Sequence, residues 1–168
     1  MPHPMVLQLK FTRSEFRRTL TKISEKDAQK RVMPINSISW TVGHLAWQEQ
    51  RYFIYFPTGK MILPEIQEKY SFGAPPSTPP LKAMLAAWLK IVREADKFLD
   101  TLTAKMLLQY VELDGRKTSR MYGNLLQRVI YHYWYHTGEN MAVRKILGHH
   151  GIGYFVGNID EKAPYTPG

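Results

Sequence analysis

The sequence contains no cysteine, which excludes disulfide bonds, thiolate metal ligands and a cysteine nucleophile. It has no apolar run near the roughly 20 residues that a membrane-spanning helix needs. Its first residues lack the basic start and the apolar core of a secretory signal. We therefore expect a cytoplasmic protein with no membrane partner, in which any metal is bound by His, Asp or Glu.

The 168 residues and the 44% hydrophobic content suit one globular domain spanning 1–168. Part of the formal charge of +9 is patterned, because basic residues recur at every fourth position: Arg18, Lys22, Lys26 and Lys30. Such a stripe is either a solvated helix face or a contact for an anionic partner. Stacking aromatics do not alternate with it, as single-strand binding requires, so we do not expect nucleic acid as a partner.

Hydrophobic periodicity predicts four long helices, at about 5–24, 39–55, 79–102 and 120–147. The third is expected to follow an N-cap at Thr78 with Pro79 as its first residue, and the fourth a cap at Thr118 or Ser119. Gly148 is expected to stop the fourth helix. These elements predict an all-α fold, a four-helix bundle.

The connections differ in length. Residues 56–80 carry many Pro and Gly residues, which predicts a long crossover loop between the second and third helices. Residues 107–113 alternate weakly before the turn pair Asp114-Gly115, so a short extended segment is expected there. The tail after Gly148 mixes glycine with aromatic residues, and we expect it to pack back on the bundle.

Two histidines, His132 and His136, are four residues apart in the fourth helix. That spacing stacks two side chains about 5–6 Å apart on one face, close enough for both imidazoles to bind one metal ion. Glu139 shares this core-facing side of the helix, and a buried carboxylate needs a cation or a histidine N–H as partner. Trp134 lies on the opposite side, where it is predicted to cover a subunit contact or to pack under a loop.

The expected third ligand is His44, midway along the second helix with Gln48 and Arg51 on its face. Three neutral imidazoles leave a coordination position open, as in catalytic metal sites. We expect Gln48 to orient His44, and Arg51 to bind a substrate carboxylate or phosphate. Tyr133 is expected to line the pocket. The alternative is that His44 is an ordinary core residue.

The segments SISWTVGHLA, ending at Ala46, and HYWYHTGE, ending at Glu139, together resemble the DinB-like superfamily of metalloenzymes. The resemblance implies an up-down-down-up four-helix bundle, frequently a homodimer, with zinc or nickel on His44, His132 and His136. Characterised relatives include transferases and an isomerase that use low-molecular-weight thiols. The chain departs from the family where it has Glu139, since glutamine is often found there.

Three functions follow as hypotheses. The first is an enzyme in which a metal ion activates water or a thiol for hydrolysis or transfer on a small molecule, with Glu139 as general base or as the group that orients a ligand. The second is a non-catalytic metal-binding stress-response protein, in which the ion ties two helices together. The third, nucleic acid binding through the basic stripe, is the least favoured.

Overall fold

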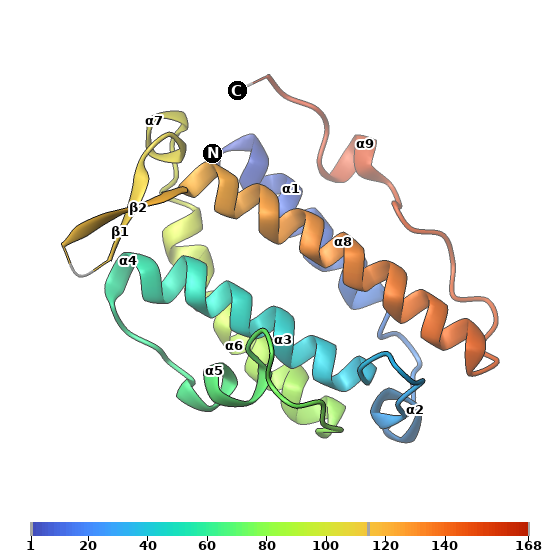
Figure 1. Cartoon of the computed structure of the whole chain (residues 1–168). Coiled ribbons are helices and arrows are strands. Elements are labelled where there is room, and N and C mark those ends of the chain that lie inside the picture. The colour runs from blue at the N-terminus through green and yellow to red at the C-terminus, as the bar shows by residue number, and fades with distance from the viewer. Residues whose placement is uncertain (1, 114, 168) are drawn as a thin grey trace.

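The computed structural model describes residues 2–113 and 115–167, and most of them are helical. The four long helices are α1 (Pro4–Arg18), α3 (Ile38–Gln50), α6 (Leu81–Leu99) and α8 (Tyr122–Ile146). α1 packs on α8 and α3 packs on α6, while α3 also contacts α8. Figure 1 shows the two pairs side by side, with α3 and α8 adjacent although they are far apart in sequence.

Apolar faces explain this packing. α6 is the most regular example, because Trp88, Ile91, Ala95 and Leu99 recur at helical spacing and are all buried. α3 differs, since every one of its residues is buried. A helix covered on all sides holds its polar side chains inside the protein, so those of α3 need partners there.

The second predicted helix is longer than expected. α3 continues without a break through a π-helical turn, η1 (Arg51–Tyr55), and a last turn, α4 (Phe56–Thr58). It ends at Gly59, whose φ of +69° lies in the left-handed region that favours glycine. A π-helical turn inserts one residue per turn and is frequent beside functional sites.

The first helix is shorter than predicted. α1 ends at Arg18 rather than near residue 24, and Lys22 follows with a left-handed φ of +57°. The short helix α2 (Glu25–Gln29) follows, and its N-cap is Ser24, whose side chain accepts a hydrogen bond from the N–H of Asp27. The basic stripe of the sequence is therefore not one helix face.

The crossover between α4 and α6 contains the short helix α5 (Pro64–Tyr70), which contacts α3. The predicted start of α6 is wrong, because the helix begins at Leu81 and Thr78 does not cap it. Instead the Glu25 carboxylate accepts the backbone N–H groups of Leu81 and Lys82. A carboxylate at a helix N-terminus is favourable, and no local sequence pattern indicates one from 56 residues away.

The predicted extended segment is a hairpin. After α7 (Ala104–Leu107), β1 (Tyr110–Leu113) pairs in antiparallel fashion with β2 (Arg116–Met121). Thr118 and Ser119 lie inside β2, so the predicted caps of the fourth helix are wrong and α8 begins at Tyr122. Asp114 of the predicted turn lies outside the described residues.

The end of α8 agrees with the sequence, because Gly148 adopts a left-handed φ of +81° after the last turn. The tail then runs back along α1 and includes α9 (Ile159–Lys162) (Figure 1). Gly157 donates its N–H to Glu15 at 3.0 Å, and Gln8 donates to the Ala163 carbonyl at 2.7 Å.

Trp134 is half-buried, and its ring centre lies 6.3 Å from that of Phe11 on α1. It therefore packs between α8 and α1, and its predicted part in a subunit contact stays a prediction. Within residues 2–113 and 115–167, no helix combines the length and the hydropathy that crossing a bilayer requires.

Candidate metal centre

Three histidines meet between α3 and α8. One ring nitrogen from each of His44, His132 and His136 lies within 4.8 Å of the other two. His44 and His136 are buried and His132 is partly buried. The i,i+4 pair comes from α8, and the α3–α8 contact brings His44 to it.

Each ring is fixed by a hydrogen bond from its Nδ1 atom. His44 donates to the Tyr70 carbonyl at 2.7 Å, His132 to Gln48 Oε1 at 2.9 Å and His136 to Glu139 Oε2 at 2.5 Å. Carbonyl and carboxylate oxygens can only accept, so Nδ1 carries the hydrogen in all three rings. In a neutral ring this arrangement leaves Nε2 with a lone pair, the form that binds a metal ion.

The Nε2 atoms of His132 and His136 lie 2.9 Å apart. With both hydrogens on Nδ1, this contact places two lone pairs against each other, which is unfavourable unless a cation lies between or beside them. The donor set therefore fits a divalent ion, and its all-nitrogen composition suits zinc, copper, iron and nickel.

Protonation of His44 or of His132 does not supply this cation near pH 7. Burial lowers the pKa of His44 to about 4, although the hydrogen bond to the Tyr70 carbonyl raises it in part. Burial, together with repulsion from His136 and His44, lowers the pKa of His132 to about 3. Both rings are thus neutral near pH 7.

Aromatic side chains hold the ring of His44. The indoles of Trp40 and Trp47 stack on it, with ring centres 4.9 and 5.2 Å away and planes inclined by 15° and 24°. The Trp47 Nε1–H is fixed in turn by Gln67 Oε1 at 2.8 Å. His44 is therefore rigid before any ligand binds, which lowers the entropic cost of binding.

Glu139 has the histidine N–H partner that the sequence required. Burial raises the pKa of its carboxyl group, but the hydrogen bond and charge of His136 outweigh this and the pKa is lowered. Its side chain keeps 27% of its surface exposed, so the carboxylate is reachable from solvent. Tyr135 also bonds to Glu139, and the negative charge raises the pKa of that phenol.

One predicted partner differs from the structure. Gln48 does not orient His44 but reaches across to His132 on α8. The group that orients His44 is the main-chain carbonyl of Tyr70 at the end of α5. Sequence reasoning missed this contact, because any residue type supplies a carbonyl and no side-chain pattern marks it.

Tyr133 and Arg51 lie apart from the three rings. The Tyr133 hydroxyl donates to Glu49 at 3.0 Å and accepts from Trp88 Nε1 at 2.6 Å, inside the core. The Arg51 guanidinium lies over the Phe56 ring, 5.5 Å from its centre. Their roles toward a substrate stay predictions.

An ionic network beside the site joins α1, α3, α6 and α8. Arg13 contacts Glu49 through two nitrogens, at 2.7 and 2.6 Å, and Asp96 at 2.6 Å. Burial alone would lower the pKa of Arg13. The charge and the hydrogen bonds of Glu49 outweigh burial, so the pKa of Arg13 is raised. With Tyr133 bound to Glu49, this network fixes α3 relative to α8, and so fixes the distance between the two halves of the histidine cluster.

The family model of the DinB superfamily matches residues 8–139, well over half of the chain. The matched range includes all three histidines and Glu139 and ends before the last turns of α8. No match was found among curated proteins.

Proposed function

The chain belongs to the DinB superfamily, and we propose that it is a metal-dependent enzyme acting on a small molecule. In this proposal the Nε2 atoms of His44, His132 and His136 hold a divalent ion, zinc or nickel. The reaction is hydrolysis, or transfer to or from a low-molecular-weight thiol.

The contact between His132 and His136 carries this proposal. Two nitrogen lone pairs 2.9 Å apart, with both Nδ1 atoms already committed to acceptors, create a site of negative potential. His44 supplies a third lone pair, and three ligands leave at least one position open for water or substrate. This open position supports a reactive site over a closed structural one.

A bound divalent ion supplies Lewis acidity, which lowers the pKa of water or of a thiol. The chain's own groups do the rest. Gln48, Glu139 and the Tyr70 carbonyl keep the rings in the tautomer that binds metal. Glu139, which is reachable from solvent, takes up the proton that the nucleophile releases.

We further propose that Arg51 and Tyr133 contribute to substrate binding or to the shape of the site, and that the protein is a cytoplasmic homodimer. The exposed rings of Tyr131 and Tyr135 on α8 support a surface for a second copy or for substrate. The pairing of α1 with α8 and of α3 with α6 supports an up-down-down-up four-helix bundle (Figure 1).

Metal content tests the proposal most directly. Untagged protein, purified without chelators, is analysed for metals beside the double variant His44→Ala, His132→Ala and a control, His150→Ala. We expect about one zinc or nickel ion per chain in the wild type and the control and only a trace in the double variant. Equal trace amounts in all three proteins would refute the proposal.

A second function is favoured by the position of the ligands on two separate helices. An ion that joins α3 to α8 stabilises the fold without chemistry, as in a non-catalytic metal-binding stress-response protein. Removal of the metal then lowers the melting temperature, while no turnover is found with panels of thiols and electrophiles. Robust metal-dependent turnover excludes this second function.

A further inference from the structure

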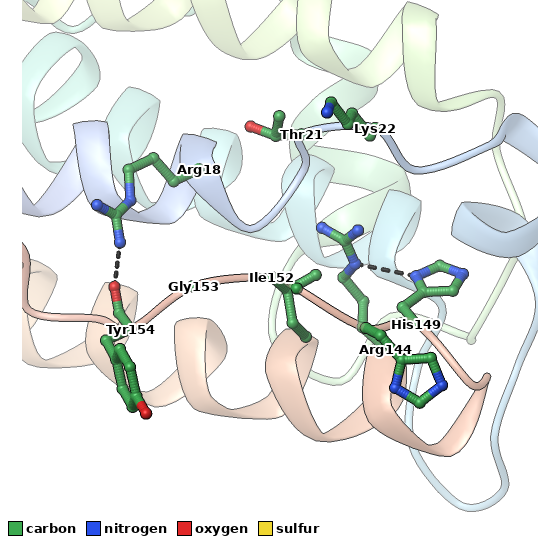
Figure 2. A pocket seen from close by; sticks show the side chains of 10 residues that line it. Arg18, Thr21, Lys22, Arg144, His149, Ile152, Gly153 and Tyr154 are labelled. Atoms are coloured by element: carbon green, nitrogen blue, oxygen red, sulfur yellow. Dashed lines mark hydrogen bonds between the residues drawn. The ribbon is translucent and has the colours of Figure 1, made fainter.

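A basic cavity of about 580 Å³ lies at the far end of α8, lined by the end of α1 and by residues after the range that the family model matches. Figure 2 shows Arg18, Thr21 and Lys22 at the end of α1 on one side, and Arg144 and His149 at the end of α8 on the other. Residues 151–154 of the tail line a further side of it. Arg144 follows His136 by eight residues, so the cavity is about 12 Å along the helix from the histidines.

The central observation is the charge of Arg144. Its residue is 4% exposed, and its guanidinium donates from Nε to His149 Nδ1 at 3.0 Å and from one terminal nitrogen to the Thr19 carbonyl at 2.7 Å. Both acceptors are uncharged. Among residues 2–113 and 115–167, no carboxylate oxygen lies within 4.0 Å of this guanidinium.

Arg13 shows what this protein does with another guanidinium of low surface exposure. It is also 4% exposed, but it is paired with two carboxylates, Glu49 and Asp96, each at 2.6 Å. Arg144 has the carbonyl ends of α1 and of its own helix α8, each worth roughly half a negative charge at most, and burial lowers its pKa. A cation without a carboxylate partner in the wall of a cavity favours an anion from outside the chain.

Two further cations line the same cavity. Arg18 is held by Glu15 at 3.3 Å, by the Tyr154 carbonyl and by the Phe155 ring. Lys22 keeps a left-handed φ of +57°, which costs a lysine more than a glycine, and it is exposed. The acidic groups nearby are Glu15 and Asp27, and Asp27 faces His149 at 3.4 Å.

We propose that this cavity binds the phosphate group of a small, soluble phosphate monoester. Lys22 and Arg144 together offer the charge that a phosphate dianion needs, and the guanidinium fork matches phosphate oxygens. A volume of about 580 Å³ leaves room for the organic part of the ligand beside Ile152. The site is separate from His44, His132 and His136, and it does not depend on the proposed enzyme activity.

The test uses metal-free protein, so that phosphate cannot bind a metal ion. Melting temperature and calorimetric binding are measured with inorganic phosphate and with glycerol 3-phosphate, and with acetate and chloride at matched ionic strength. We expect stabilisation by both phosphates and none beyond that of chloride from acetate. Arg144→Gln and Lys22→Gln should each weaken binding about ten-fold, the loss of one charge-assisted hydrogen bond.

Lys145→Gln is the matched control, since Lys145 is the exposed neighbour of Arg144 and does not line the cavity. It removes the same charge and should leave the phosphate affinity unchanged. If Arg144→Gln does not fold, the exposed Lys22 still provides the test. Equal affinities in Lys22→Gln and Lys145→Gln, equal stabilisation by acetate, or binding only to vesicles of phosphatidic acid would each overturn the proposal.

Discussion

A Cβ atom placed on Gly43 would lie 2.8 Å from the ring of Tyr70 and 2.9 Å from the sulfur of Met84. α3 therefore meets α5 and α6 at a distance that only glycine permits. The same close approach brings the Tyr70 carbonyl to 2.7 Å from His44 Nδ1. The orientation of one candidate metal ligand thus depends on the missing side chain of the residue before it.

Gly43→Ala should damage both the fold and the site. The added methyl group must displace Tyr70, a ring that is 6% exposed, and such overpacking costs about 1–3 kcal/mol of unfolding free energy. Since Tyr70 moves with its carbonyl, zinc affinity should fall although no ligand is changed. Urea denaturation and a zinc competition assay measure the two effects.

Gly138→Ala is the matched control for this substitution. Gly138 also lies inside a helix near the histidines, but nothing would lie within 4 Å of its Cβ. Alanine should therefore stabilise the protein by up to about 1 kcal/mol and leave zinc affinity unchanged. Equal behaviour of the two variants would mean that the contact with Tyr70 does not position His44.

Glu25→Ala should destabilise the protein by about 1 kcal/mol, because two N–H groups at the start of α6 lose their acceptor. Glu68→Ala removes an exposed carboxylate from α5 and serves as the control. Chemical denaturation of both variants gives the comparison. If the two differ from wild type by the same amount, Glu25 is not the cap of α6.

The sequence was most informative where local geometry decides the structure. His132 and His136 had to face one side once their segment formed a helix, and Glu139 had to find a partner there. The stop at Gly148 follows from its own backbone conformation. Each of these features depends on neighbours within one or two helical turns.

Features that depend on the packing of distant segments were missed. Gln48 lies one turn beyond His44, but the position of α8 directs it to His132. The cap of α6 comes from Glu25, and His44 is oriented by a backbone carbonyl of α5. No spacing in the sequence encodes these three contacts, because each requires the relative position of two elements.

Glu49→Gln should be among the most destabilising single changes in the core. Glu49 is fully buried and accepts two hydrogen bonds from Arg13, one from Nε and one from a terminal nitrogen. Removal of its negative charge leaves Asp96 as the carboxylate bound to the buried Arg13 guanidinium. Breaking such a pair costs about 3–5 kcal/mol. Asp96→Asn should cost less, since its side chain is 30% exposed. Calorimetric unfolding measures both, and the reverse order would contradict this account of the network.

Gln48→Ala should lower zinc affinity by about 10- to 100-fold, the usual effect of removing the partner of a histidine ligand. The ring of His132 loses the acceptor at 2.9 Å that keeps the hydrogen on Nδ1. Gln67→Ala is the control, because Gln67 touches the site only through Trp47. Competition with a zinc chelator measures both affinities. The same loss in both variants would show a general disturbance of the helices and not the loss of one orienting bond.

Metal-free protein should lose stability as the pH falls from about 6.5 towards 4. An unfolded histidine has a pKa of about 6.5, whereas burial lowers the pKa of His44 to about 4 and that of His132 to about 3 in the folded protein. In this window the unfolded chain binds protons that the folded chain does not, so the unfolding free energy decreases with decreasing pH, by on the order of 4 kcal/mol between pH 7 and 5 for the two rings together. Urea denaturation in phosphate-free buffer with chelator measures the slope. His132→Gln should reduce it, while His150→Gln, at an exposed position, should not. A wild-type slope near zero would mean that His44 and His132 are not buried in their neutral form.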